Sequence, residues 1–84
     1  MKQDMYPKIT AYIIENQNKF YRLAYSYVRN REDALDVVQN AVCSALEHYQ
    51  TLRSQEAIRT WFYRILVNEC LMILRNRKQT FTED

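Results

Sequence analysis

Between residues 30 and 78, the charged side chains of this 84-residue sequence divide into an acidic stretch and a basic stretch, each suited to binding a macromolecule of opposite charge. Residues 30–50 contain four acidic residues and one arginine, a net charge of −3. Residues 53–78 contain six basic and two acidic residues, a net charge of +4. Because regions of opposite sign attract different partners, this pattern indicates one surface for a basic protein and another for nucleic acid.

The acidic stretch places polar side chains at helical spacing. Asp33, Asp36 and Asn40 stand at i, i+3 and i+7, which puts them on one face of a helix, and Gln39 flanks that face. A partner bound there should be basic, and its binding should weaken as salt is added. The alternative is that these acids only solvate the helix and favour the positive end of its dipole.

The basic stretch carries candidates for contacts with DNA. Arginine can grip a phosphate with two hydrogen bonds, and each neutralised phosphate releases counterions. The phosphate candidates are Arg59, Arg64, Arg75, Arg77 and Lys78. Asn68 could bond to a base edge or to a helix neighbour, while Tyr49 and Tyr63 are the better candidates for stacking on unpaired bases. The alternative is a solvated face with charges at a helix end.

The sequence indicates no catalytic or metal site. It contains no glycine, so it has no Gly-rich phosphate loop, and we expect neither an enzyme nor a bound cofactor. Cys43, Cys70 and His48 do not stand at metal-ligand spacing, so we expect no metal. Two thiols within helical patterns favour small buried residues of a cytoplasmic protein. No apolar run approaches the ~20 residues of a membrane span, so we expect no membrane insertion.

Helices are expected throughout, because glycine is absent and the one proline, Pro7, suits a first helical turn. Apolar residues at helical spacing predict a helix over residues 7–29. Residues 16–18 are the poor helix formers Asn-Gln-Asn, so this segment is either one bent helix or two consecutive ones.

Two further helices are predicted from their expected N-caps. Asn30 should cap a second helix that reaches about Tyr49, and Ser54 should cap a third that ends near residue 77 or 78. Residues 79–84 are expected to fray. The predicted fold is therefore all-α, a compact three- to four-helix bundle that forms a single domain over residues 1–84.

The expected core consists of apolar positions that recur along each helix. In the second helix these positions are Leu35, Val38, Ala41/Val42, Ala45/Leu46 and Tyr49. In the third helix they are Ile58, Trp61/Phe62, Ile65/Leu66 and Leu71 or Met72.

Three segments stand together in an order and spacing found in a known family. They are YRLAYSY at residues 21–27, DALDVVQ at residues 33–39, and a segment from WFYRILVN to the basic cluster RNRK at residues 61–78. In this combination the sequence resembles region 2 of bacterial extracytoplasmic-function sigma factors, over about residues 18–78. The resemblance implies a small helical bundle that acts in transcription initiation by binding rather than by catalysis.

The resemblance also implies a protein partner for the acidic helix. In the family this helix docks on the coiled coil of the β′ subunit of core RNA polymerase. On this sequence, that contact falls on Asp33, Asp36, Gln39 and Asn40. Asn40 stands where the family commonly has an acid, which removes one charge from the docking face. An anti-sigma factor is a further partner that the resemblance allows.

DNA is the second implied partner. The loop and third helix of the family recognise the −10 promoter element and hold flipped bases of one strand. On this sequence, that contact falls on residues 49–56, with Tyr49 and Arg53, and on the exposed face of residues 59–78. Met72 stands where the family commonly has an acid, and we attach no function to that difference.

Other interpretations stay open at this stage. Complete family members carry a second domain, region 4, which reads the −35 element. This sequence stops at Asp84, where the linker to region 4 would begin, so we expect either an excised domain or one half of a split sigma factor. A different class is a helical protein-interaction adaptor that does not bind DNA.

Overall fold

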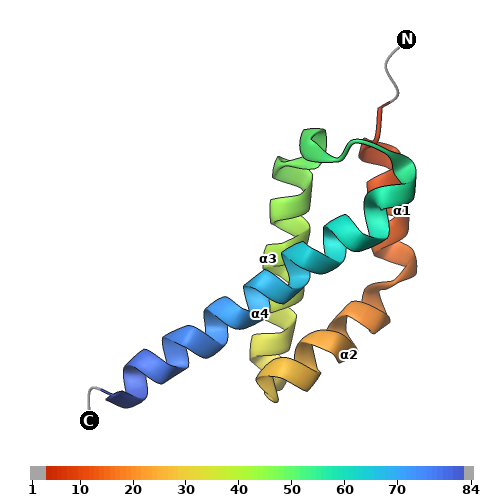
Figure 1. Cartoon of the computed structure of the whole chain (residues 1–84). Coiled ribbons are helices and arrows are strands. Elements are labelled where there is room, and N and C mark those ends of the chain that lie inside the picture. The colour runs from red at the N-terminus through yellow and green to blue at the C-terminus, as the bar shows by residue number, and fades with distance from the viewer. Residues whose placement is uncertain (1–3, 83–84) are drawn as a thin grey trace.

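The computed structural model describes the backbone of residues 4–82 and the side chains of residues 4–77. Four α-helices follow one another, α1 (Tyr6–Glu15), α2 (Gln17–Val28), α3 (Arg31–Glu47) and α4 (Ile58–Thr82), and two short 3-10 turns, Tyr49–Thr51 and Gln55–Ala57, join α3 to α4. Within the described backbone no strand is present. The all-α prediction is confirmed. In Figure 1, α4 crosses α3 and its C-terminal half projects beyond the other helices.

The first helical segment is two helices rather than one bent helix. Helix α1 ends at Glu15, and its C-cap is Asn16, whose side-chain Nδ2 donates a hydrogen bond back to the carbonyl of Tyr12 at 2.8 Å. Helix α2 ends at Val28, and its C-cap Arg29 takes the left-handed conformation with φ of 55°. Asn30 is then extended, so the chain turns from α2 into α3 over two residues.

Phe62 of α4 lies at the centre of the core and is fully buried. Its ring lies 4.5 Å from that of Phe20 in α2 and 6.3 Å from that of Tyr12 in α1, centroid to centroid. Helix α3 completes the core and packs mainly against α2 and α4. One buried cluster therefore includes residues of all four helices.

The predicted core stripe of α3 is wrong by one position in its first half. Leu35 is 49% exposed, and Val38 is only half-buried. The buried residues are Ala34, Val37, Ala41 and Ala45. Three of the four are alanines, and small side chains at a contact allow helices to pack at short interaxial distances. Hydrophobicity alone favoured the larger neighbouring residues, which instead form a second apolar strip beside the core.

The predicted course of α4 also needs correction. Cys70 is buried where Leu71 or Met72 was expected, and those two side chains are 43% and 50% exposed. The helix begins at Ile58, after a 3-10 turn, and it continues to Thr82. Ser54 precedes that turn, but its side chain makes no capping hydrogen bond.

Candidate docking and nucleic-acid surfaces

The outer face of α3 presents polar side chains away from the core. Asp36 and Asn40 are both exposed, as the sequence analysis requires of a docking face. Cys43 and Glu47 are exposed too, and they continue the same face at spacings of three and four residues. Those two residues were not predicted, although the same spacing rule would have identified them.

An apolar groove of about 870 Å³ runs beside this polar face. Helix α3 contributes one wall, and the α1–α2 junction contributes the other. Its main apolar lining residues are Ile13, Ile14, Leu35, Val38, Val42 and Leu46. Gln39, one of the predicted docking residues, also lines the groove, so the polar face and the groove are continuous. The groove was missed in the sequence because its residues were assigned to the core.

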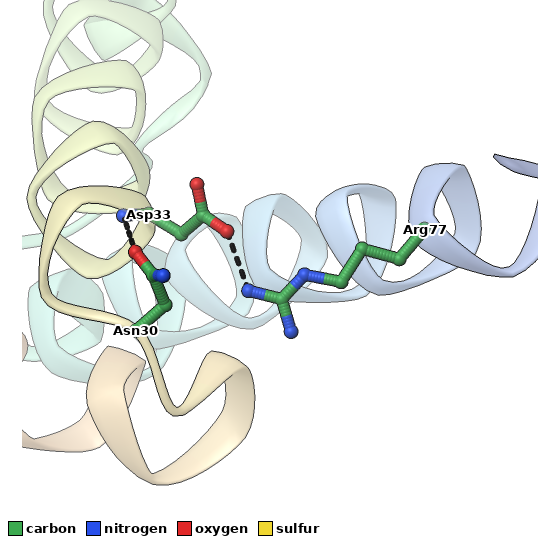
Figure 2. A network of polar contacts seen from close by, with 3 residues as sticks. All are labelled: Asn30, Asp33 and Arg77. Carbon is green, nitrogen blue, oxygen red and sulfur yellow. Dashed lines mark hydrogen bonds and ion pairs between the residues drawn. The ribbon is translucent and has the colours of Figure 1, made fainter. Parts of the chain in front are cut away.

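Asp33 is half-buried, unlike the exposed Asp36. Its carboxylate Oδ2 accepts a hydrogen bond from Nη2 of Arg77 at 2.5 Å, and the two side chains form an ion pair (Figure 2). Asn30 caps α3, since its Oδ1 accepts a hydrogen bond from the backbone N–H of Asp33 at 2.9 Å. The predicted N-cap is confirmed. Asp33 and Arg77 had been expected on two separate surfaces, and the structure brings them together.

The predicted DNA-contacting residues of α4 form two groups. Arg64, Asn68 and Arg75 are exposed, and at 100° per residue they lie within about 40° of one another around the helix. This stripe faces away from the buried residues. Tyr63, which is 51% exposed, and Arg59 lie on a neighbouring part of the helix, one turn apart.

Arg59 is near the buried side of the bundle. Burial raises the pKa of the Tyr12 phenol above its ordinary value, and the positive charge of Arg59 lowers it part of the way back. The guanidinium is itself exposed, so it remains available to a ligand. The described residues therefore offer three exposed arginines on α4, at positions 59, 64 and 75.

The loop between α3 and α4 is held from two sides. The Tyr49 ring meets the Tyr6 ring edge to face, with centroids 5.4 Å apart, and Nζ of Lys8 donates to Oε1 of Gln55 at 2.8 Å. From the other side, Nε1 of Trp61 donates to Oγ1 of Thr51 at 3.0 Å. Tyr6 and Lys8 were not predicted, since no local pattern links residues more than 40 positions apart.

Arg53 lies in the same loop and is exposed, whereas Tyr49 is half-buried. The stacking prediction for Tyr49 therefore concerns a ring that already has an aromatic neighbour. The side chain of Lys78, the last predicted phosphate contact, lies outside the described residues.

The two cysteines differ in environment, and neither forms a disulfide. Cys43 is exposed, so its predicted burial is wrong, whereas Cys70 is buried as expected. Within residues 4–77, no group of three or more His, Cys, Asp or Glu side chains could hold a metal ion. Among the helices of the described residues, none combines the length and the apolar character needed to cross a membrane.

Comparison with known proteins gave matches along most of the chain. The family model for sigma-70 region 2 matches residues 12–80. RNA polymerase sigma factor SigV of Bacillus subtilis is 42% identical over 78 residues, which cover 93% of this chain and 47% of that protein. ECF RNA polymerase sigma factor SigM of Mycobacterium tuberculosis is 38% identical over 63 residues, covering 75% of this chain and 32% of that protein.

A third relative, ECF RNA polymerase sigma-E factor of Haemophilus influenzae, is 42% identical over 52 residues, which cover 62% of this chain and 27% of that protein. The chain thus spans about half the length of the first relative and about a third of the second. No solved structure gave a significant match.

Proposed function

The chain belongs to the sigma-70 region 2 family, within the extracytoplasmic-function class, and we propose that it binds core RNA polymerase through α3 and promoter DNA through α4. Sigma factors are transcription initiation factors rather than enzymes, so the proposed activity consists of binding. The −10 element is the proposed DNA target, and the β′ coiled coil is the proposed polymerase contact.

The proposed polymerase surface combines the polar face of α3 with the groove beside it. Asp36 and Asn40 supply exposed polar groups, and Gln39 joins them to the groove, where Leu35 and Leu46 are accessible. Charged groups at such a surface speed and orient the encounter, while burial of apolar area supplies most of the free energy of binding. Docking should therefore weaken with salt but persist in part.

The proposed DNA surface begins with the exposed stripe of Arg64, Asn68 and Arg75 on α4. Two arginines 11 residues apart lie about 16 Å apart along a helix axis, which spans several phosphates of a nucleic-acid strand. Arg59 and Tyr63 extend this surface toward the loop, where Arg53 is exposed. Tyr63 is the best-placed aromatic ring for stacking on an unpaired base, because half of it is free of protein contacts.

One observation carries this proposal. The polar face of α3 and the arginine stripe of α4 are both exposed, and they have opposite charge on two helices that belong to the matched region. An acidic face favours a basic protein over DNA, and an arginine stripe favours DNA, so the two faces together support two partners.

The experiment that tests polymerase docking reverses one charge. Asp36→Arg should lower the affinity for purified core RNA polymerase by at least tenfold, because it places a cation against a basic partner. Glu56→Arg is the matched control, since it makes the same charge change at an exposed site in the loop after α3. Circular dichroism would show that both variants are folded. Equal affinities for the two variants would contradict docking through α3.

A further inference from the structure

The ion pair between Asp33 and Arg77 joins the two helices to which we assign separate partners. Asp33 belongs to the first turn of α3, and Arg77 lies in the C-terminal half of α4, 44 residues later. Both side chains are about one-third exposed, which makes the contact partly shielded from solvent. Figure 2 shows the Arg77 side chain extended from α4 toward the start of α3.

Arg77 is placed where the apolar packing of α4 against the core becomes sparse. Up to residue 77, where the description of side chains ends, Cys70 is the last buried residue of α4, and Arg77 comes seven residues later, about 10 Å farther along the axis. Between them, Ile73 and Leu74 are half-buried, and the other side chains are exposed. Those two side chains still pack against the core, and the ion pair adds a contact with the body of the protein about one turn beyond them.

The start of α3 is built to hold the acid in position. The Asn30 side chain caps the helix by accepting a hydrogen bond from the Asp33 backbone, which fixes the first turn. Asp33 also lies at the positive end of the α3 dipole, where a carboxylate is favoured before any partner is added. Arg77 thus meets a carboxylate whose backbone is held in a capped first turn.

We propose that Asp33 and Arg77 form an intramolecular clamp that positions the C-terminal half of α4, instead of contacting polymerase and DNA separately. Asp33 and Arg77 are positioning residues in this assignment. The clamp acts on the stretch that carries Arg75, two residues before Arg77, and so orients an arginine of the proposed DNA surface. The clamp itself does not depend on the proposed function, and only the role of Arg75 in binding DNA rests on it.

The test compares variants that remove one or both partners. Asp33→Asn and Arg77→Gln each remove a charge with little change in shape, and the double variant removes both. Matched controls come from the same helices: Asp36→Asn removes an acid from α3 that lies on the outer face, and Arg75→Gln removes an exposed arginine from α4. Amide hydrogen exchange of residues 71–76 in the free chain measures how firmly this part of α4 is held.

Both single variants should exchange about twofold to fivefold faster over residues 71–76, as expected for a partly exposed ion pair. The double variant should match either single one, because each change already breaks the same contact. Both controls should leave exchange unchanged. Unchanged exchange in Asp33→Asn, or additive effects in the double variant, would overturn the clamp.

Binding to core RNA polymerase separates the clamp from direct docking. Asp33→Asn and Arg77→Gln should change that affinity by the same factor, less than about twofold. A tenfold loss for Asp33→Asn alone would make Asp33 a docking residue and would overturn the assignment. Because exchange is measured without polymerase, failure of the proposed function would show in the Asp36→Asn affinity and would leave the exchange result intact.

Discussion

Between Ile58 and Cys70, α4 buries one side chain in every turn, whereas between residues 71 and 77 it buries none. The first half packs through Ile58, Phe62, Leu66 and Cys70 against the other helices. The second half is held by two half-buried side chains and the ion pair with Asp33. In Figure 1 this second half is the part of α4 that extends past the bundle.

The difference shows how one helix can stabilise the core with one half and carry exposed side chains beyond the core with the other. Burying a large apolar side chain contributes about 1.5–3 kcal/mol, whereas a partly exposed ion pair contributes about 0–1 kcal/mol. The first half is therefore part of the core, while the second half is held by weaker contacts. The arginine stripe runs along both halves of α4. Arg64 lies in the half that packs in the core, and Arg75 lies in the half beyond it.

The largest effect should come from truncation of the core residue of the first half. Phe62→Ala should lower the free energy of unfolding by about 3–5 kcal/mol, because it removes the ring that packs on Phe20 and leaves a cavity. Leu71→Ala, in the second half, should change it by less than about 0.5 kcal/mol. Urea unfolding would measure both. Similar losses would contradict the division of α4 into two halves.

The arginines of the stripe allow the same comparison in DNA binding. Arg64→Ala should weaken binding of a single-stranded oligonucleotide about tenfold, since charge-assisted hydrogen bonds contribute about 1.5–3 kcal/mol. Arg75→Ala should weaken binding less, by about threefold, because the less firmly held half of α4 loses more conformational freedom when DNA binds. Fluorescence anisotropy would measure both. If neither variant binds more weakly, the chain fits the adaptor interpretation instead.

The helix caps offer a smaller test. Asn30→Ala should lower the free energy of unfolding by about 1 kcal/mol, since it leaves the Asp33 backbone N–H without its side-chain acceptor. Ser54→Ala is the matched control, because the Ser54 side chain makes no capping hydrogen bond before the first half of α4. Thermal unfolding would compare them, and equal losses would show that Asn30 has no special contribution.

Cys70, the last buried residue of the first half, should give a small pH dependence. Burial is the main cause that raises the pKa of its thiol above the ordinary value of 9.0. The folded protein then keeps a proton that the unfolded chain loses, so stability is complete below about pH 9 and falls as the pH rises further. Melting temperatures should therefore decline less steeply in Cys70→Ala than in the parent protein above about pH 9.

Cys43→Ala is the control for that experiment, since Cys43 is exposed. Burial also raises the pKa of the Tyr12 phenol, so part of the decline in melting temperature with pH should remain in every variant. Parallel curves for Cys70→Ala and the parent protein would exclude a contribution from the buried thiol.

The sequence predicts the local features of this fold well. The break at Asn16 and the cap at Asn30 follow from the chemistry of single side chains, and the structure shows both. The buried face of α3 was harder to predict. Leu35 is more hydrophobic than Ala34, yet Ala34 is the residue that fits between the helices. The distance between the packed helices decides which of the two residues is buried, and the periodicity of the sequence does not give that distance.

The candidate site was predictable where it depends on one helix. Asp36 and Asn40 on α3 are exposed as their spacing indicates, and Arg64 and Arg75 on α4 are exposed, as a contact with phosphate requires. Contacts between distant segments were not predictable. Nothing local in the sequence pairs Asp33 with Arg77, and the groove became visible only after the α1–α2 junction was placed against α3.

The central claim is that α3 and α4 present separate surfaces to polymerase and DNA. It is tested most directly by measuring two folded variants, Asp36→Arg and the double variant Arg64→Ala/Arg75→Ala, against both core RNA polymerase and single-stranded DNA. Asp36→Arg should lose polymerase binding and keep DNA binding, and the double variant should do the reverse. If either folded variant lost both activities together, or kept both, the assignment of separate surfaces would be contradicted.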